Sequence, residues 1–290
     1  MSFSAEVKAE LEKIVPASRH CQLAELSAII HFGCKIEATK DGGSEIELST
    51  ENDAAFRKYF TLLKKTFMIG TDADKVLQAI KLFEGNKQIR TVHDSVNPML
   101  IKNSCCRRAF LRGAFLCVGS MSDPQKSYHL EFVCDREAKA VQIREAINSF
   151  DLDAKIVKRK KYFVVYLKEG AGIVDLLNVM GAHLSLMNLE NLRIEKEMRN
   201  SINRQVNCEA ANIAKTVNAA NKQIEDIQLL EKCYGFSNLP ENLRQMAIVR
   251  LAYPESSLQE LGGYLNPPVG KSGVNHRLRK LSEMAEKIRN

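Results

Sequence analysis

The 290-residue sequence lacks any stretch that approaches the roughly 18 consecutive apolar residues of a membrane span. It carries no lipidation signature, and residues 1–12 lack the apolar core of a signal peptide. We therefore expect a cytoplasmic protein with no membrane partner. No two of its eight cysteines form a C-x-x-C pair, so we favour reduced thiols over a metal site or disulfides. We expect no cofactor and no metal.

Glycine and proline are both absent from Ala182–Tyr234, and no strand pattern appears there. Apolar residues recur instead at steps of three or four, which is typical of a long helix. They are Ile202, Val206, Ala210, Ile213, Val217, Ala220, Ile224 and Ile227. A solvated spacer helix needs no such stripe. We therefore predict a helical linker over residues 188–235 whose apolar stripe packs against another surface.

The bulk composition is ordinary. Hydrophobic residues make up 45% of the chain and charged residues 27%, as in most globular proteins. The net charge of +7 permits an acidic partner without identifying one, because the location of the excess charge matters more than its size.

The first 187 residues repeat one order of elements: helix, hairpin, helix, hairpin, helix. The first repeat covers residues 1–100, with helices over 19–33 and 52–67, a hairpin around Asp41-Gly42-Gly43, and an ambiguous second hairpin turning at Glu84-Gly85-Asn86-Lys87. The second repeat covers residues 101–187, with helices over 105–118, 136–150 and 170–180, a strand over 128–134 and a hairpin over 154–168. Two similar halves of this kind can meet through their first helices.

The repeats also predict which residues of one helix are buried and where one strand is missing. In the helix over 52–67, we expect the inward face to hold Phe56, Tyr59, Phe60 and Leu63. In the second repeat, Ser120–Lys126 has the composition of a loop, although the repeat calls for a strand after Gly119.

Residues 236–290 predict an all-helical domain with helices over 240–252, 257–265 and 272–288. The last helix buries an apolar stripe made of Val274, Leu278, Leu281 and Ala285. Its other faces and its start carry the polar and basic residues Lys271, Ser272, Asn275, His276, Arg277, Arg279 and Lys280. Asn and Arg can bond to purine edges, so this pattern favours a recognition helix in the major groove of double-stranded DNA. The alternative is a structural bundle with a solvated basic face.

Three blocks of this sequence resemble the WhiA family of bacterial regulators. They are Cys21–Ile30, Arg199–Asn212 and Ser257–Lys280, and the resemblance spans essentially the whole chain. The resemblance implies a fold of class α+β: a pseudo-two-fold domain like a LAGLIDADG homing endonuclease, then a long helical linker and an all-α helix-turn-helix domain. It also implies a role in transcription, cell division and chromosome segregation, or in sporulation where the host sporulates.

Within this resemblance, the two LAGLIDADG-like helices are Leu26–Cys34 and Leu111–Gly119. Small residues at Ser27, Ala28, Gly113 and Ala114 would let them cross closely. A working nuclease needs an acid at the penultimate position of each motif to hold divalent metal ions. Those positions are Gly33 and Val118, and the other acidic position of each motif holds His31 or Leu116. We expect His31 to be a buried or capping residue, and the chain to have no nuclease activity and not to be an enzyme.

The hairpin over 154–168 is a possible second DNA contact. Its turn carries Lys158, Arg159, Lys160 and Lys161, and the whole hairpin has no acid. Such a cluster neutralises phosphates, but lysines also guard solvated edge strands, and both interpretations stay open. The first hairpin is acidic instead, with Glu37, Asp41, Glu45 and Glu47, so we expect the two halves to contact DNA differently.

The leading hypothesis is therefore a DNA-binding, nucleoid-associated transcriptional regulator. A residual metal-dependent DNA endonuclease is one alternative. The other is an assembly protein whose long helix recruits a protein partner, and the resemblance likewise points to a protein co-regulator as a second partner.

Overall fold

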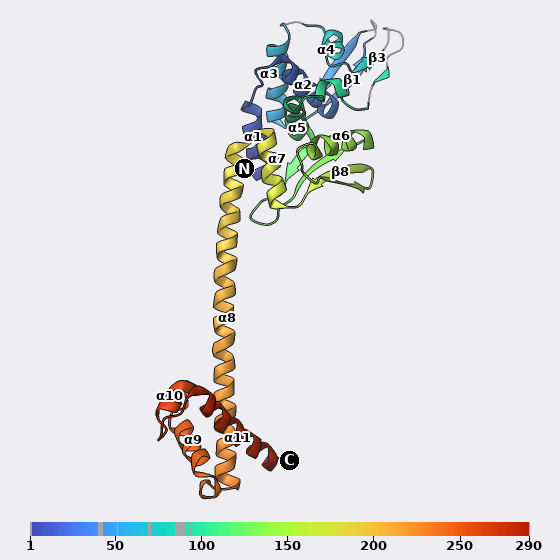
Figure 1. Cartoon of the computed structure of the whole chain (residues 1–290). Coiled ribbons are helices and arrows are strands. Elements are labelled where there is room, and N and C mark those ends of the chain that lie inside the picture. Colours follow the sequence, from blue (N-terminus) through green and yellow to red (C-terminus); the bar gives the residue numbers. More distant parts are fainter. Residues whose placement is uncertain are drawn as a thin grey trace. The chain divides into compact units, whose positions relative to one another are not determined.

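The computed structural model describes residues 2–39, 43–50, 52–68, 71–84, 91–92 and 94–289. The chain divides into two units, Met1–Glu197 and Met198–Asn290, and Figure 1 colours their elements along the sequence. The first unit mixes helices with antiparallel strands, and the described part of the second is helical. The predicted class, α+β followed by a helical C-terminal part, is confirmed. No described helix is both long and apolar enough to pass through a bilayer.

The first half of the N-terminal unit confirms one predicted hairpin and adds unpredicted helices. Its described elements are α1 (Phe3–Lys13), α2 (Arg19–Gly33), β1 (Cys34–Ala38), β2 (Ser44–Leu48), α3 (Asp53–Thr66), α4 (Ala73–Ala79), β3 (Phe83–Glu84) and β4 (Thr91–Val92). Strands β1 and β2 pair antiparallel, although Asp41 and Gly42 of their turn lie outside the described residues. Strands β3 and β4 also pair antiparallel, and Glu84 lies in β3 opposite Thr91 rather than in the predicted turn, whose other residues 85–87 lie outside the described residues. The sequence pattern did not predict α1 or α4.

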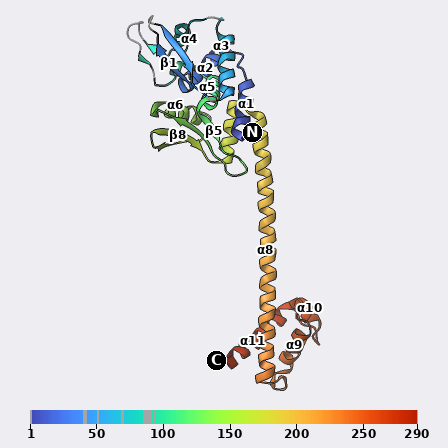
Figure 2. The ribbon, with the colours of Figure 1, turned by 180° about the vertical axis from the view of Figure 1, so that it is seen from behind.

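The second half follows the predicted order closely. Its elements are a 3₁₀ turn η1 (Pro98–Ile101), α5 (Ser104–Val118), β5 (Gly119–Met121), β6 (Leu130–Cys134), α6 (Glu137–Asn148), β7 (Lys155–Arg159), β8 (Tyr162–Leu167) and α7 (Gly170–Met180). The four strands form an antiparallel sheet in the order β5-β6-β8-β7. Helix α6 lies against this sheet in both ribbon views (Figures 1 and 2).

The expected loop after Gly119 is partly wrong, because its first residues form strand β5. Gly119 pairs with Phe132 and Met121 pairs with Leu130 on β6. Both Gly119 and Met121 are buried, so the segment is held by the sheet and core beside it. Local residue preferences do not include this tertiary contact, which is why the sequence pattern missed the strand.

Helices α2 and α5 cross at the centre of the N-terminal unit, and Gly113 sets how closely they approach. A Cβ atom at Gly113 would lie 2.6 Å from the carbonyl oxygen of Glu25 and 3.0 Å from the Cβ of Ala28. Real Cβ contacts are longer than this, so only glycine fits without moving a helix backbone. The prediction that small residues let the two helices cross closely is confirmed.

A buried ionic network lies beside this crossing. The Glu25 carboxylate on α2 accepts two hydrogen bonds from Arg112 on α5, at 2.9 and 3.2 Å. Lys58 on α3 also pairs with Glu25, at 3.1 Å, and both of these side chains are fully buried. Arg112 further donates to the carbonyl of Met180 at the end of α7. Three helices thereby meet at one carboxylate, and Arg112 links a fourth, α7, to them.

The predicted inward face of α3 is partly wrong. Phe56 and Phe60 are 50% and 43% exposed, whereas Tyr59 is buried and Lys58 is wholly buried. The cause is α1, because the Lys58 ammonium donates to the carbonyl oxygens of Leu11 and Ile14 at the end of that helix. The apolar stripe alone placed the phenylalanines inward because it contained no information about this polar anchor.

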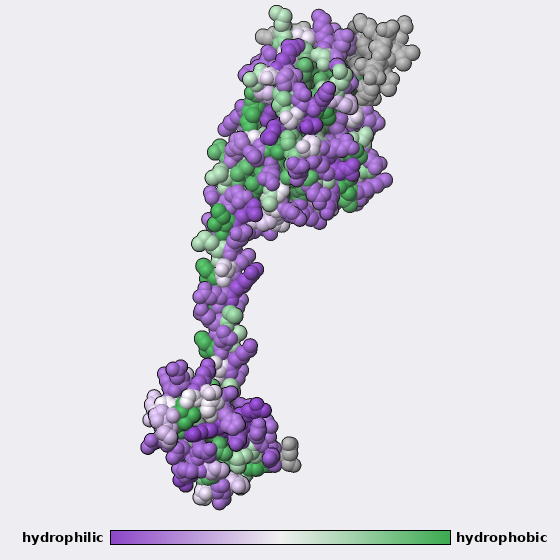
Figure 3. All heavy atoms as spheres, in the orientation of Figure 1, coloured by the Kyte–Doolittle hydropathy of each residue, from purple (hydrophilic) through white to green (hydrophobic). Residues whose placement is uncertain are grey.

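Helix α8 spans His183–Cys233 and confirms the predicted long helix. The prediction that its whole apolar stripe packs against another surface is wrong for the described residues of a single chain, because only part of the stripe is buried. Ala220 is buried and Ile227 is buried in the core of the C-terminal helices, but Ile202, Val206, Ile213 and Val217 remain about half or more exposed. Figure 3 shows hydrophobic side chains at several points along this exposed part of the helix.

The C-terminal unit adds a 3₁₀ turn and three helices to the end of α8. These are η2 (Phe236–Asn238), α9 (Glu241–Ala252), α10 (Leu258–Gly263) and α11 (Lys271–Arg289). Their apolar faces enclose a separate core with Ile227 and Leu230 of α8. Arg289 at the end of α11 also pairs with the buried Asp226 of α8 at 2.8 Å. The bundle therefore includes the last turns of the long helix.

We predict that Gly113→Ala lowers the free energy of unfolding by about 1–3 kcal/mol, because overpacking forces the crossing helices apart. Urea unfolding of the full chain, followed by circular dichroism, measures this change. The matched control is Gly172→Ala in α7, where the nearest atom to a new Cβ lies 3.8 Å away. That variant should keep its stability or gain up to about 1 kcal/mol from improved helix propensity. Equal stability of the two variants would contradict the close crossing.

Candidate nucleic-acid interface

Helix α11 divides into a buried face and an exposed polar face, as the sequence predicted. Val274, Leu278, Leu281 and Ala285 are all buried against α9 and α10. The exposed residues at its start and along its N-terminal half are Lys271, Ser272, Asn275, His276, Arg279 and Lys280. Arg277 is half-buried at the flank of the helix. The predicted residues therefore form one continuous surface, with Arg277 at its margin.

The connection from α10 to α11 is held firmly, although it is longer than an ordinary helix-turn-helix turn. The backbone N–H of Val269 donates to the carbonyl of Gly262 at 3.0 Å. A Cβ at Gly262 would lie 1.9 Å from the Val269 carbonyl oxygen, so glycine is required where the turn folds back on α10. The turn is therefore a packed part of the domain that fixes where α11 begins.

A capping box starts α10 and adds to this rigidity. The Ser257 hydroxyl accepts from the backbone of Glu260, and the Glu260 carboxylate accepts from the backbone N–H of Ser257 at 2.8 Å. These hydrogen bonds to the carboxylate lower the pKa of Glu260 from its ordinary value. The sequence signal for this box is the Ser-x-x-Glu spacing.

The start of α11 borders a shallow depression of about 550 Å³ that is lined by Leu258, Lys271, Ser272 and Asn275. The first backbone N–H groups of a helix attract anions, and the Lys271 ammonium adds positive charge at the same place. Asn275 also lines a second hollow together with Lys215 of α8. Sequence spacing does not indicate that Lys215 lies near Asn275, because this proximity depends on how α8 packs in the bundle.

Arg279 projects from the middle of the exposed face and is 78% exposed. Its guanidinium forms an ion pair with Glu283 one turn later, at 3.0 Å. Exposed pairs of this kind contribute little to stability, so Arg279 can leave Glu283 at small cost to bond with another partner.

The hairpin of β7 and β8 displays the predicted basic cluster at one edge of the sheet. Lys158, Arg159, Lys160 and Lys161 are all exposed, and β7 is the edge strand. Arg159 forms a partly exposed ion pair with Glu131 at 3.4 Å, and the Lys158 ammonium lies 5.5 Å from the ring centre of Phe163. These positions fit both interpretations, a phosphate contact and a guarded sheet edge.

The first hairpin differs in charge from the second. Lys35 pairs with Glu47 and Glu37 pairs with Glu45 across β1 and β2, and these four side chains are exposed on one face. Three carboxylates against one ammonium make this face acidic. That the two hairpins contact DNA differently stays a prediction, and their exposed charges differ as it requires.

The C-terminal ends of α2 and α5, where a LAGLIDADG nuclease holds its metal ions, have apolar surroundings here. A Cβ at Gly33 would meet the Cys117 Sγ at 2.9 Å and a Leu48 methyl at 3.5 Å. Burial raises the pKa of the Cys117 thiol to about 12. Among the described residues, no group of three or more His, Cys, Asp or Glu side chains gathers at this end.

His31 is buried, as expected, and its Nδ1 donates to the carbonyl of Ser27 at 2.9 Å. Leu116, the matching position on α5, is also buried, and Val118 is half-buried. Asp123 lies beyond β5, where its carboxylate accepts from the backbone N–H of Gln125 at 2.9 Å. The two-carboxylate centre of an active nuclease is therefore not assembled from the described residues at these positions.

Three family models match consecutive parts of the chain. The WhiA N-terminal LAGLIDADG-like domain matches residues 19–100, the WhiA LAGLIDADG-like domain matches residues 107–199, and the WhiA C-terminal HTH domain matches residues 202–285. These matches agree with the two repeats and with the helical C-terminal unit described above.

Similar proteins cover the chain from end to end. A protein of Lachnoclostridium phytofermentans named probable cell division protein WhiA is 52% identical, with 100% of both chains covered. Another of that name from Alkaliphilus oremlandii is 46% identical over 99% of this chain and 98% of its own. A solved structure is described as the crystal structure of full-length DUF199/WhiA from Thermatoga maritima. Its sequence is 28% identical to this chain, the match covers 99% of both chains, and the TM-score is 0.60. The chain belongs to the WhiA family, with its paired LAGLIDADG-like domains and C-terminal helix-turn-helix domain.

Proposed function

We propose that the protein is a DNA-binding transcriptional regulator that inserts the N-terminal half of α11 into the major groove. The observation that carries this proposal is the division of α11, whose apolar side holds the domain together while Asn275 and Arg279 face outward. These side chains can bond to purine edges, and Lys271 with Ser272 can bind the adjacent phosphate. The relatives' name, probable cell division protein, supports a role in cell division.

DNA binding of this kind would place the protein on the nucleoid, where a role in chromosome segregation, or in sporulation in some hosts, is part of the same proposal. The second contact in this proposal is the β7–β8 hairpin. Its cluster of exposed cations would bind phosphates with weak sequence preference. The acidic face of β1 and β2 would be repelled by DNA, so the contact is made by one repeat only.

We predict that Arg279→Ala weakens binding to a duplex selected from a random library by about 1–3 kcal/mol, the range for one lost base contact. Fluorescence anisotropy on the full chain measures this change. Lys287→Ala is the control, because Lys287 is an exposed cation on the same helix beyond the proposed contact. An equal loss on random-sequence DNA would assign Arg279 to a phosphate and overturn its proposed role in base recognition.

We predict that Lys160→Ala reduces the slope of log affinity against log salt concentration by about one phosphate contact. The measurement is a salt titration of binding by the full chain. Lys64→Ala, which removes an exposed cation from α3, serves as the control and should leave the slope unchanged. A slope that is the same for Lys160→Ala and the wild type removes the hairpin from the interface.

We also propose that the protein does not cleave DNA, since Gly33 and Val118 offer no carboxylate to a metal ion. Supercoiled DNA incubated with the full chain and Mg²⁺ or Mn²⁺ should stay supercoiled over hours. An Asp123→Asn variant prepared in parallel removes a carboxylate that lies just beyond the end of the second motif, and it controls for contaminating nucleases, because a contaminant nicks equally in both samples. Nicking that copurifies with the wild-type chain and disappears from the variant would favour the residual endonuclease.

The exposed apolar residues of α8 support the other alternative, an assembly protein. Ile202, Val206, Ile213 and Val217 would contact a protein co-regulator in that case, and DNA contact would be incidental. The Arg279→Ala measurement separates the two functions, because an incidental contact does not distinguish a selected duplex from random DNA.

A further inference from the structure

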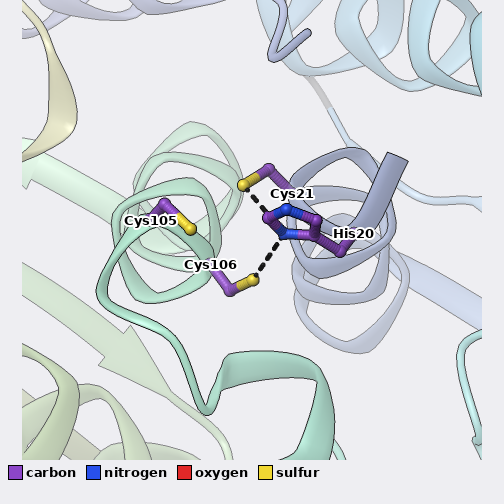
Figure 4. A group of neighbouring side chains, drawn as sticks. All are labelled: His20, Cys21, Cys105 and Cys106. Atoms are coloured by element: carbon purple, nitrogen blue, oxygen red, sulfur yellow. Dashed lines mark hydrogen bonds between the residues drawn. The ribbon is translucent and has the colours of Figure 1, made fainter. Parts of the chain in front are cut away.

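Four side chains that commonly bind metal ions meet at the N-terminal ends of α2 and α5 (Figure 4). They are His20 and Cys21 from α2, and Cys105 and Cys106 from α5. Their four potential ligand atoms all lie within 4.8 Å of one another. The His20 Nδ1 is 3.1 Å from the Cys106 sulfur and 3.3 Å from the Cys21 sulfur. The imidazole thus lies between thiols from two different helices.

The two pairs occupy equivalent positions in the two repeats. Helix α2 begins at Arg19 and α5 begins at Ser104, so each pair comes directly after the first residue of its helix. Because the helices cross at Gly113 as a pseudo-symmetric pair, equivalent positions near their starts are brought together. Spacing along the chain hides this, since neither pair alone has the ligands of a zinc site.

We propose that these four side chains bind one zinc ion in a Cys₃His site. Structural zinc sites use four protein ligands in a tetrahedron, with bonds of about 2.3 Å to sulfur and about 2.0 Å to nitrogen. Such bonds place neighbouring ligand atoms about 3.5–3.8 Å apart. The separations present here fall on both sides of that range, so small side-chain movements complete the tetrahedron.

The electrostatic setting suits this ion. Three thiolates and one zinc ion carry a net charge of −1, and both helix N-termini direct backbone N–H groups and positive partial charge toward it. Neither Ser18 nor Asn103 caps its helix through its side chain. Those side chains therefore do not compete for the first-turn N–H groups, of which the N–H of Cys21 donates to the Ser18 carbonyl at 3.1 Å.

Burial of two ligands and the presence of four protein ligands both favour a structural role for this ion. Cys21 and Cys106 are buried against Ala24 and Ala109, whereas His20 and Cys105 are exposed and leave a path for metal entry. Four protein ligands leave no open position for a substrate. The ion joins the starts of the two central helices, at the opposite ends from Gly33 and Val118.

A disulfide between Cys21 and Cys106 is the rival chemistry for this cluster. It would leave Cys105 and His20 without a role, whereas zinc uses all four side chains. The two chemistries exclude each other, because a disulfide removes two of the thiolates that zinc requires.

The test is the metal content of the full-length protein, purified with a reducing agent, loaded with Zn²⁺ and freed of excess metal. We expect about one zinc per chain. Cys105→Ser and His20→Ala should reduce the content to near zero, and both residues are exposed, so neither change opens the core. Cys208→Ser and Cys233→Ser are matched controls at exposed thiols of α8 and should retain the zinc. Zinc content well below one in the wild type, or unchanged in Cys105→Ser, would overturn the proposal.

Cobalt substitution supplies a second readout that does not depend on stability. Co²⁺ added to the metal-free full chain should give the visible bands of a tetrahedral site and a sulfur-to-cobalt charge-transfer band, and His20→Ala should alter or abolish both. An octahedral spectrum would overturn the proposal. So would a Cys21–Cys106 disulfide as the main species when the protein is isolated with its thiols blocked.

Discussion

The N-terminal unit depends on the crossing of α2 and α5, where Gly113 lies against the backbone of Glu25. The same residue of α2 provides the carboxylate that Arg112 and Lys58 share. A buried charge that loses one partner is strongly destabilising, whereas the intact network adds little net stability. Loss of one partner would therefore destabilise this crossing, and the close approach at Gly113 requires the same alignment of the helices. This crossing sets the position of one repeat relative to the other, because each repeat contributes one of the two helices.

The two ends of this crossed helix pair carry side chains of different chemistry. At the C-terminal ends, Gly33 and Val118 supply no oxygen ligands, and the surroundings are apolar. At the N-terminal ends, one imidazole and three thiols converge. The scaffold of a metal-dependent nuclease can thus persist without its cutting centre, because the helix packing does not depend on the carboxylates. In the proposed function, contact with DNA is made by the C-terminal helices and by the basic hairpin.

Much of this structure could be predicted from periodicity, because burial of one face leaves a direct pattern in the sequence. The faces of α11 and the hairpin of β7 and β8 are of this kind. The features that were missed depend on contacts between distant segments. Lys58 is buried because α1 offers it carbonyl oxygens, which leaves Phe56 and Phe60 exposed. The cluster around His20 exists only when two helices from different repeats meet.

The most direct test of the account is a crystal structure of the full chain bound to a selected DNA duplex. We expect α11 in the major groove, with Asn275 and Arg279 within hydrogen-bond distance of base edges and Lys271 at a phosphate. The α2 and α5 ends at Gly33 and Val118 should hold no metal ion at the DNA backbone. A complex in which α11 faces away from the duplex, or in which metal ions bridge those ends to a phosphate, would contradict the account.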